Sequence, residues 1–406
     1  MFFQSKVCSQ VLKVVFLLRK VINIVTYYSV FSLFFCLERI IFKSKVHWCF
    51  STWSNYAHTM DNVRSVFEVV KDDPNLIKVV LLCGQDKCSD YVGVNVKVVQ
   101  ENSVMGAYYL ARCQVYLLGT SLQGFTNFHA SIGSKHKLIQ LWHGIPLKRI
   151  GMLFPSEKFW QDETYKYSAT VCSSPADKLF MQQAFSPLPL NKVWQTGLPR
   201  NDFILAGDKH LPDDYLSELG RIREKVKGRF LVLYAPTWRD NIDNIYKFSN
   251  GELFRLNEIL VGCNAVLAIR GHANVRSSVG VGEEDAFDNI IYVNDVPDAN
   301  LLLKEAGALI TDYSSIYIDF LITNRPIVYF TYDIDSYINE RGFLYDLEEA
   351  FVCDPVVTFN QLLDDVERAV MMGVTDEERY GRVKSLFHQH DDNSGLAVVN
   401  KIKDLL

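Results

Sequence analysis

The sequence predicts an α/β protein built from two Rossmann-like domains, each with a parallel sheet. Short apolar runs rich in β-branched residues alternate with amphipathic stretches long enough for helices, and they fall into two sets along the 406 residues. Such runs are typical of parallel strands covered on both faces. The first set comprises residues 46–52, 78–84, 96–100, 115–120, 137–142, 169–174 and 192–197, and the second comprises 230–235, 265–271, 290–295, 308–311 and 326–330.

The join between the two predicted domains falls in residues 200–228, where GDKHLPDD precedes the charged stretch LSELGRIREKVKG. We therefore place the first domain at residues 46–205 and the second at 206–406. A 49% hydrophobic content argues against disorder, and a net charge of -5 gives no reason to expect a nucleic-acid partner. The nine cysteines are scattered without a CxxC pair, which indicates reduced thiols in a cytoplasmic protein.

Residues 1–45 form a basic, apolar leader ahead of the first domain. They carry seven lysines and arginines against the single acid Glu38. The longest uncharged stretch, Val21 to Leu37, has 17 residues, at the lower limit of the roughly 17 to 25 that cross a bilayer as a helix. We favour helices lying in the headgroup region of an anionic membrane. A spanning helix and helices packed on the protein itself are the alternatives, and no cleavage site indicates a removed signal peptide.

Four polar motifs follow four of the predicted strands. WHGIPLK follows residues 137–142, PTWRD follows 230–235, GHANV follows 265–271 and DYSS follows 308–311. In open parallel sheets, ligands bind beyond the carboxyl ends of the strands, where loops lead into helices. Motifs from both strand sets at such positions predict a ligand site between the two domains.

The DYSS motif carries the clearest anion chemistry. Asp312 or a following serine can cap a helix that runs to about Thr323, and a helix N-terminus offers unpaired amides and partial positive charge. Ser314 and Ser315 add hydroxyl donors suited to a phosphate, and Asp319 lies on the same helical face as Ser315. An ordinary helix cap is the alternative.

Other candidate groups follow the strands of the second domain. Arg270 and His272 could together face a negatively charged leaving group, and Arg239 also follows a strand; a structural role is the alternative for each. The sequence contains no P-loop, GxGxxG, GxSxG or HExxH pattern, which disfavours an ATPase, a simple dehydrogenase, an esterase and a zinc peptidase. We expect no required cofactor, although Asp333-Ile-Asp335 leaves Mg²⁺ on a diphosphate open.

A set of seven motifs gives the chain a family resemblance. They are WHGIPLKRIG (142–151), TGLPRND (196–202), YAPTWRD (234–240), RGH (270–272), ITDYSSIYIDF (310–320), RPIVYFTYD (325–333) and RGFLYD (341–346). In these motifs and their order the chain resembles the CDP-glycerol glycerophosphotransferases, the teichoic-acid primases and polymerases of bacterial cell envelopes. The resemblance implies a GT-B fold, in which two Rossmann-like domains face a cleft. It also implies transfer of glycerol phosphate from CDP-glycerol to a lipid-linked acceptor, with release of CMP, in teichoic acid or capsule synthesis at the cytoplasmic face of the membrane.

The resemblance further implies roles for individual residues. His143 matches the histidine that takes the proton from the acceptor hydroxyl, and His272 matches a second essential histidine near the diphosphate. An imidazole, with an ordinary pKa of about 6.5, is suited to act as a base near neutrality. The predicted catalytic residues are thus His143 and His272, and the predicted donor-binding residues are Arg239, Arg270, Ser314, Ser315, Asp312 and Asp319, the two acids organising the loop around the serines.

Three departures from the family pattern leave the exact donor and acceptor open. Ile145 stands where the family usually has threonine, Ala273 where it commonly has proline, and the sequence CDPVVTF from Cys353 lacks a Pro-Gly pair. CDP-ribitol or another CDP-linked alcohol is therefore an alternative donor. A GT-B glycosyltransferase, and a catalytically silent membrane protein that binds nucleotide or anionic glycolipid, are the alternatives from other classes.

Overall fold

The chain forms two compact units. The computed structural model describes residues 28–51, 61–82, 91–154, 159–237, 246–271, 287–334, 337, 342–389 and 393–406. Unit 1 contains Met1–Thr59 and Val70–Ile139, and unit 2 contains Met60–Val69 and Gln140–Leu406. Residues 1–27 of the leader and the predicted site residues Arg239, His272 and Asp335 lie outside the described residues.

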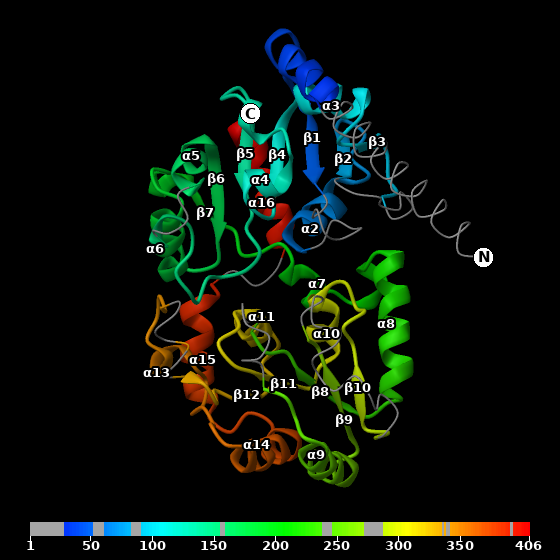
Figure 1. Cartoon of the computed structure of the whole chain (residues 1–406), viewed down its shortest axis with the longest axis vertical. Helices are drawn as coiled ribbons and strands as arrows, with labels where there is room; N and C mark the ends of the chain where they lie inside the picture. The colour runs from blue at the N-terminus through cyan, green and yellow to red at the C-terminus, as the bar shows by residue number, and fades with distance from the viewer. Residues whose placement is uncertain are drawn as a thin grey trace, which may run out of the picture. The chain divides into compact units, whose positions relative to one another are not determined.

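The twelve predicted strands are confirmed, and every strand pair that the structure describes is parallel (Figure 1). The α/β class with parallel sheets is therefore confirmed. The strands are β1 (Ser44–Ser51), β2 (Ile77–Leu82), β3 (Val96–Gln100), β4 (Cys113–Leu118), β5 (Lys137–Gln140), β6 (Tyr167–Cys172), β7 (Val193–Gln195), β8 (Phe230–Tyr234), β9 (Ala265–Ile269), β10 (Ile290–Tyr292), β11 (Ala308–Thr311) and β12 (Ile327–Tyr329).

Helices follow most strands, as alternating α/β patterning predicts. They are α2 (Asp61–Val70), α3 (Val104–Arg112), α4 (Leu122–Phe125), α5 (Phe159–Glu163), α6 (Pro175–Ala184), α7 (Asn201–Leu205), α8 (Asp213–Val226), α9 (Asn250–Gly262), α10 (Ala299–Glu305), α11 (Ile316–Phe320), α13 (Leu347–Ala350), α14 (Phe359–Met372), α15 (Glu377–Phe387) and α16 (Ser394–Leu405). The charged stretch of the predicted join is α8, which ends where Lys227 adopts the left-handed conformation.

Unit 1 is built on strands in the order β3-β2-β1-β4-β5. Cys49 of β1 lies opposite Val79 of β2 and Tyr116 of β4. Trp48, Cys49 and Phe50 are consecutive and all fully buried, which is the arrangement expected of a strand covered on both faces.

The described part of the leader is a helix over residues 28–40 that packs on unit 1 through a buried charged cluster. The Glu38 carboxylate accepts a hydrogen bond from Lys43 Nζ at 2.7 Å and lies 2.9 Å from His136 Nε2. Lys43 Nζ also donates to the carbonyl of Ala111 at 2.8 Å. Burial raises the pKa of Glu38, but His136 and Lys43 outweigh that effect and hold the pKa below its ordinary value.

The same segment also exposes large apolar side chains. Tyr28, Phe35 and Ile40 are exposed on this helix, Ile40 by 71%, and Phe42 just after it is 86% exposed. Part of the leader therefore packs on the protein while another part of its surface faces outward. No helix within the described residues is both long and apolar enough to cross a membrane.

Unit 2 contains the parallel pair β6 and β7 and a five-stranded sheet of order β10-β9-β8-β11-β12. Val232 in the middle of β8 lies opposite Leu267 of β9 and Ala308 of β11. These residues belong to a buried core onto which α9 and α14 pack. Both helices begin with a capping box, which satisfies N-terminal amides that would otherwise lack partners.

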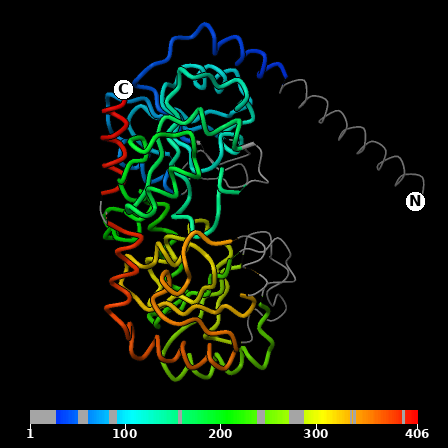
Figure 2. Tube along the Cα trace, turned by 90° about the vertical axis from the view of Figure 1, so that its left-hand side faces the viewer, coloured from blue at the N-terminus to red at the C-terminus, as the bar shows by residue number. Residues whose placement is uncertain are grey.

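The last two helices of unit 2 contact helices from an earlier part of the same unit. In unit 2, α15 contacts α6 and α16 contacts α7, and this end of the chain runs along one side of the trace (Figure 2). The Asp202 carboxylate of α7 accepts hydrogen bonds from the Ser394 and Gly395 amides at the start of α16. Residues 140–205 are thereby held in one unit with the five-stranded sheet, which positions the site described next.

Candidate active site

The WHG motif leaves β5 with an unusual backbone. We predicted a strand to residue 142, but β5 ends at Gln140 because Trp142 adopts a φ of +54° and cannot continue an extended strand. The Gln140 side chain accepts a hydrogen bond from the Trp142 amide at 2.9 Å. Gly144 has a φ of +141°, and a Cβ at this position would lie 2.6 Å from Arg200 Nη2. The position therefore requires glycine.

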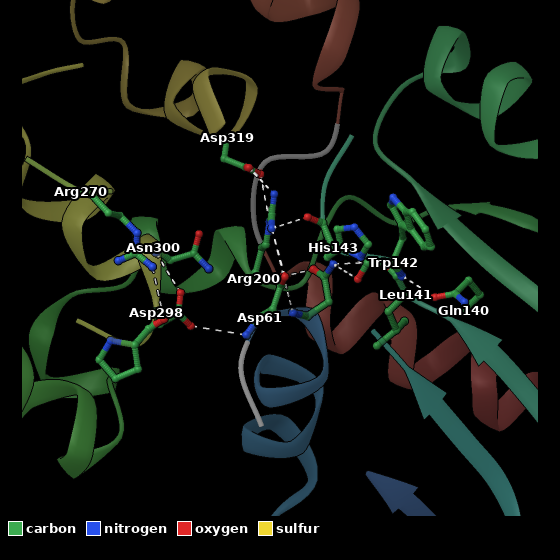
Figure 3. Close-up of polar contacts among 12 residues, drawn as sticks. Asp61, Gln140, Leu141, Trp142, His143, Arg200, Arg270, Asp298, Asn300 and Asp319 are labelled. Carbon is green, nitrogen blue, oxygen red and sulfur yellow. Dashed lines mark hydrogen bonds and ion pairs between the residues drawn. The ribbon is translucent and has the colours of Figure 1, made fainter. Parts of the chain in front are cut away.

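Side chains from two other segments hold the carbonyls of this loop (Figure 3). Asn62 Nδ2 donates to the carbonyls of Leu141 and Trp142, both at 3.0 Å. Arg200 Nη1 donates to the carbonyl of His143 at 2.7 Å. Three successive carbonyls thus have side-chain donors, which fix the loop before any ligand binds.

The His143 ring lies on the face of the Trp142 ring. The ring centroids are 4.1 Å apart with an interplanar angle of 29°. Trp142 is buried and packs against Trp160 and Phe185, whereas His143 is half-buried. Trp142 therefore provides the packing, and His143 keeps the partial exposure that chemistry at its ring would need.

Arg200 connects three segments of unit 2. Its Nε donates to Asp319 Oδ1 at 3.2 Å, its Nη2 forms an ion pair with Asp319 Oδ2, and its Nη1 lies 3.1 Å from Asp61 Oδ2 (Figure 3). The Arg200 amide donates to Asn62 Oδ1 at 3.0 Å. The Arg200 side chain is 11% exposed, against 15% for Asp61 and 2% for Asp319, so solvent screens these ion pairs weakly.

Burial and the attraction between opposite charges compete in the electrostatics of this cluster. Burial raises the pKa of Asp319 to about 6, against the lowering influence of Arg200. Burial also raises the pKa of Asp61, against the lowering influences of Arg200 and His143. For Arg200, burial lowers the pKa, but Asp319 and Asp61 outweigh that effect and the net shift is upward. Arg200 is therefore charged under all ordinary conditions.

A further set of contacts fixes Asp61 and α2. Asp298 accepts hydrogen bonds from the Asp61 amide at 3.4 Å, from the Asn300 amide at 2.9 Å and from the Tyr215 hydroxyl. The guanidinium of Arg64 in α2, which is 1% exposed, lies 5.3 Å from the centre of the Tyr215 ring in α8. The start of α2 is thus tied to α8 and to the segment before α10.

The DYSS segment lies beside the WHG loop, and of the two predicted caps, Asp312 or a following serine, the structure has the serine Ser315 at the cap position; Asp312 has another role. Its carboxylate instead accepts hydrogen bonds from the amide and hydroxyl of Thr237, at 2.7 and 2.6 Å. Ser315 occupies the cap position without a side-chain hydrogen bond to the described helix backbone. The helix α11 continues as a 3₁₀ turn to Thr323, where the predicted helix ends. A Cβ on Gly144 would lie 3.5 Å from Ser315 Oγ.

The segment after WHG also pairs with the segment of the RGFLYD motif. The Leu344 amide donates to the Leu147 carbonyl at 2.9 Å, and Lys148 forms an isolated bridge with Phe343. Lys148 Nζ lies 4.8 Å from the centre of the Tyr337 ring. Motifs that are far apart in the sequence therefore meet in one region of unit 2.

The remaining predicted residues have varied placements. The Arg270 guanidinium donates to the carbonyls of Val296 and Pro297 at 2.9 and 3.4 Å, so its contact with a donor phosphate stays a prediction. Arg239 and His272 lie outside the described residues. Within the described residues, no group of three or more His, Cys, Asp or Glu side chains is arranged to hold a metal ion.

Three residues of the site were missed from the sequence. Arg200 stands in the quoted TGLPRND motif, which gave it a position but no role. Asp61 and Asn62 lie at least nine residues beyond the predicted strand 46–52 and in no quoted motif, so the search for motifs directly after strands did not find them. Their contacts are non-local and become visible only in the folded chain.

Comparisons with known proteins identify relatives of the chain. The family described as CDP-Glycerol:Poly(glycerophosphate) glycerophosphotransferase matches residues 32–403. The teichoic acid glycerol-phosphate transferase of Staphylococcus aureus (strain NCTC 8325 / PS 47) is 30% identical over 269 residues, which span 62% of this chain and 66% of that protein. The teichoic acid poly(glycerol phosphate) polymerase of Bacillus spizizenii (strain ATCC 23059 / NRRL B-14472 / W23) is 28% identical over 310 residues, which span 71% of this chain and 75% of that protein.

Two further comparisons bear on fold and donor. A solved structure of the wall teichoic acid polymerase TagF matches 96% of this chain and 97% of its own, with a TM-score of 0.74 and 23% identity, which shows the shared fold. The teichoic acid ribitol-phosphate primase of the same Bacillus spizizenii strain is 27% identical over 312 residues, which span 73% of this chain and 75% of that protein. Proteins that use glycerol phosphate and ribitol phosphate are thus about equally similar to the chain.

Replacing Arg200 by alanine should destabilise the protein strongly. The free energy of unfolding at neutral pH should fall by about 3 to 5 kcal/mol, because Asp61 and Asp319 would stay buried without their cation. Arg200 lowers the pKa of Asp319, which is about 6 in the wild type. Without Arg200 the folded chain therefore holds protons on these acids at higher pH than the wild type does, so the deficit should shrink as the pH falls from neutral toward about 6. Urea unfolding of Arg221→Ala, whose side chain is 41% exposed, is the control and should lose less than about 1 kcal/mol. Equal losses in both variants would contradict the assignment.

Proposed function

Because the chain belongs to the CDP-glycerol:poly(glycerophosphate) glycerophosphotransferase family, we propose that it transfers glycerol phosphate from CDP-glycerol to a hydroxyl of a lipid-linked glycan or polyol-phosphate acceptor and releases CMP. The observation that carries this proposal is the approach of the WHG loop to the DYSS segment, which is close enough that a Cβ added to Gly144 would lie 3.5 Å from Ser315 Oγ. This approach puts a histidine and two serine hydroxyls on adjacent loops, where one substrate can reach both.

The proposed reaction needs a base and a binding site for the donor phosphates. His143 takes the proton of the acceptor hydroxyl, whose oxygen forms a bond to the β-phosphorus of CDP-glycerol. The bond from that phosphorus to the bridging oxygen breaks, and CMP leaves with the electron pair. General base catalysis is worth about 10² to 10⁴ in rate, and the remainder comes from positioning and from stabilising charge.

The donor side of the site is assigned partly by resemblance. Ser314 and Ser315 are half-buried at the start of α11, and their hydroxyls are suited to donate to phosphate oxygens. The α-helical part of α11 has only five residues, so these hydroxyls support the assignment more than the helix dipole does. Arg239 and His272 are proposed on the donor side from their motifs alone.

Two finer features belong to the same proposal. We place the two Rossmann-like domains in a GT-B arrangement facing a cleft, which the likeness to TagF supports. CDP-ribitol is the second candidate donor, and it is favoured by a ribitol-phosphate primase that is almost as similar to the chain as the glycerol-phosphate polymerase is.

Incubation of the full chain with radiolabelled CDP-glycerol and a lipid-linked disaccharide tests the proposal. Release of CMP together with a phosphodiester product is expected. Parallel reactions with CDP-ribitol and with nucleotide sugars separate the alternative donors. If no CDP-linked alcohol yields CMP, the phosphotransferase proposal is wrong.

Replacement of the two histidines should separate chemistry from donor binding. His143→Ala should reduce turnover by at least about 10² while CDP-glycerol still binds, because the base is removed and the donor contacts remain. His272→Ala should also abolish turnover and weaken donor binding. His210, which is exposed, offers the matched control, and His210→Ala should keep the wild-type rate. A wild-type rate in either of the first two variants would remove that histidine from the mechanism.

We further propose that the protein attaches peripherally to the cytoplasmic face of the membrane through its leader. The described leader exposes most of the Ile40 and Phe42 side chains, and Arg39 and Lys45 beside them are exposed cations. Apolar side chains flanked by cations suit the boundary between acyl chains and anionic headgroups.

A double substitution of Ile40 and Phe42 by serine should weaken binding to vesicles that contain phosphatidylglycerol. Each exposed side chain contributes about 1.5 to 3 kcal/mol when it is buried in lipid, so the affinity should fall at least about tenfold. Cosedimentation measures the affinity, and Val261→Ser, at an exposed apolar position of α9, is the control. Unchanged binding of the double variant would contradict this attachment surface.

A further inference from the structure

The side chain of His388, which directly follows α15, is buried between two other segments of unit 2. His388 is 4% exposed, and Ser173, directly after β6, is fully buried. His388 Nε2 lies 2.6 Å from the carbonyl of Ile318 in α11, and Nδ1 lies 3.1 Å from Ser173 Oγ. A carbonyl oxygen can only accept, so Nε2 donates to Ile318, and Nδ1 accepts a hydrogen bond from the Ser173 hydroxyl. The two ring nitrogens thus connect α11 to the end of β6.

On one side, this connection reaches the serines proposed to bind the donor phosphates. The Ile318 amide donates to the carbonyl of Ser315 at 3.0 Å, while the Ile318 carbonyl accepts the hydrogen bond from His388. The α-helical part of α11 has only five residues. A helix this short is not stable by itself, so its position depends on contacts with the rest of the protein. His388 supplies one of these contacts, one turn away from the serines.

On the other side, Ser173 is a firm attachment point because its backbone is held in both directions. Its amide donates to the Asp177 carboxylate at 2.8 Å, and its carbonyl accepts from the Gln389 amide at 3.0 Å. Asp177 is 1% exposed, so water competes little for these bonds. Residues 388 and 389 are therefore bound to Ser173 by one side-chain contact and one backbone contact.

The strand that ends at Ser173 also holds the start of the WHG loop. Thr170 Oγ1 in β6 donates to the carbonyl of Gln140 at 2.9 Å, and the Gln140 side chain accepts from the Trp142 amide. A continuous series of hydrogen bonds and short chain segments therefore runs from the loop that carries His143, through β6 and His388, to the first turn of α11.

We propose that His388 is a positioning residue that fixes α11, with Ser314 and Ser315, relative to the loop that carries His143. This inference rests on the proposed function, in which the base and the donor-binding hydroxyls act on one substrate phosphate. A displacement of about 1 Å between such groups can cost about 10²-fold in rate. His388 acts through Ile318 and Ser173, and no bond to its own ring forms or breaks in the transfer.

The variant His388→Leu of the full chain tests this assignment, because it removes both hydrogen bonds and leaves an apolar side chain in the buried space. KM for CDP-glycerol should rise about tenfold and kcat for CMP release should fall about tenfold. His388→Gln should recover most of this loss, because its amide offers one donor and one acceptor, as the imidazole does.

Ser173→Ala is a milder variant that decides the question if His388→Leu does not fold. It removes one hydroxyl and leaves the contact between His388 and Ile318 in place. KM for CDP-glycerol should rise about two- to tenfold, the equivalent of one hydrogen bond. A wild-type KM in Ser173→Ala would then overturn the inference.

His136→Leu is the matched control, because His136 is also a buried histidine with both ring nitrogens in contact. Its Nδ1 lies 2.7 Å from the carbonyl of Cys113 and its Nε2 lies 2.9 Å from the Glu38 carboxylate, so it holds the leader helix on unit 1. This variant should lose thermal stability, as His388→Leu does, but keep the wild-type KM for CDP-glycerol.

Two outcomes separate this inference from the proposed function. If the wild type releases CMP but His388→Leu keeps the wild-type KM, or if both leucine variants change KM equally, the inference is wrong and the proposed function stands. If the wild type releases no CMP from any CDP-linked alcohol, the proposed function fails, and the role of His388 fails with it.

Discussion

The site depends on one buried guanidinium. Arg200 gives hydrogen bonds to Asp61, to the carbonyl of His143 and to Asp319, which come from three distant parts of the sequence. Burying an ion pair contributes little net stability, because desolvation of the charges offsets most of their attraction. What the arrangement does supply is geometry. The planar guanidinium of Arg200 can donate to all three acceptors in a single arrangement of the three segments. It therefore fixes their positions relative to one another.

The backbone near the Arg200 guanidinium contains residues in strained conformations, and the hydrogen bonds of this site hold them there. Asp61 and Trp142 both have positive φ values, and such conformations cost of order 1 to 3 kcal/mol each. Asn62 and Arg200 hold the carbonyls beside them. A histidine presented by such a loop has little freedom to lose when a substrate binds. This pre-organisation is consistent with a residue that has to meet a hydroxyl at hydrogen-bond distance.

The sequence predicted the sheets better than it predicted the site. All twelve strands are present because a buried parallel strand needs only a local run of apolar residues, as Trp48, Cys49 and Phe50 illustrate. The errors arise where distant side chains compete with local rules. Trp142 leaves its strand early, in a loop whose carbonyls are held by Asn62. The sequence left the helix cap open between Asp312 and a following serine, and the binding of Asp312 to Thr237 leaves the cap position to Ser315. Which partner a buried polar side chain chooses depends on the tertiary fold, and periodicity carries no such information.

The saturation of Arg200 also decides which residues can contact a donor phosphate. A charge-assisted hydrogen bond to phosphate is worth about 1.5 to 3 kcal/mol, whereas breaking one side of a buried ion pair costs about 3 to 5 kcal/mol. Arg200 would therefore lose more by turning from Asp319 toward a phosphate than it would gain. Asp312 does not contact phosphate for a different reason, because its carboxylate only accepts hydrogen bonds, here from Thr237, and its negative charge repels a phosphate. The buried charges hold the loops in place. The proposed donor contacts Ser314 and Ser315 are only half-buried, so an exchange of water for phosphate at their hydroxyls costs little.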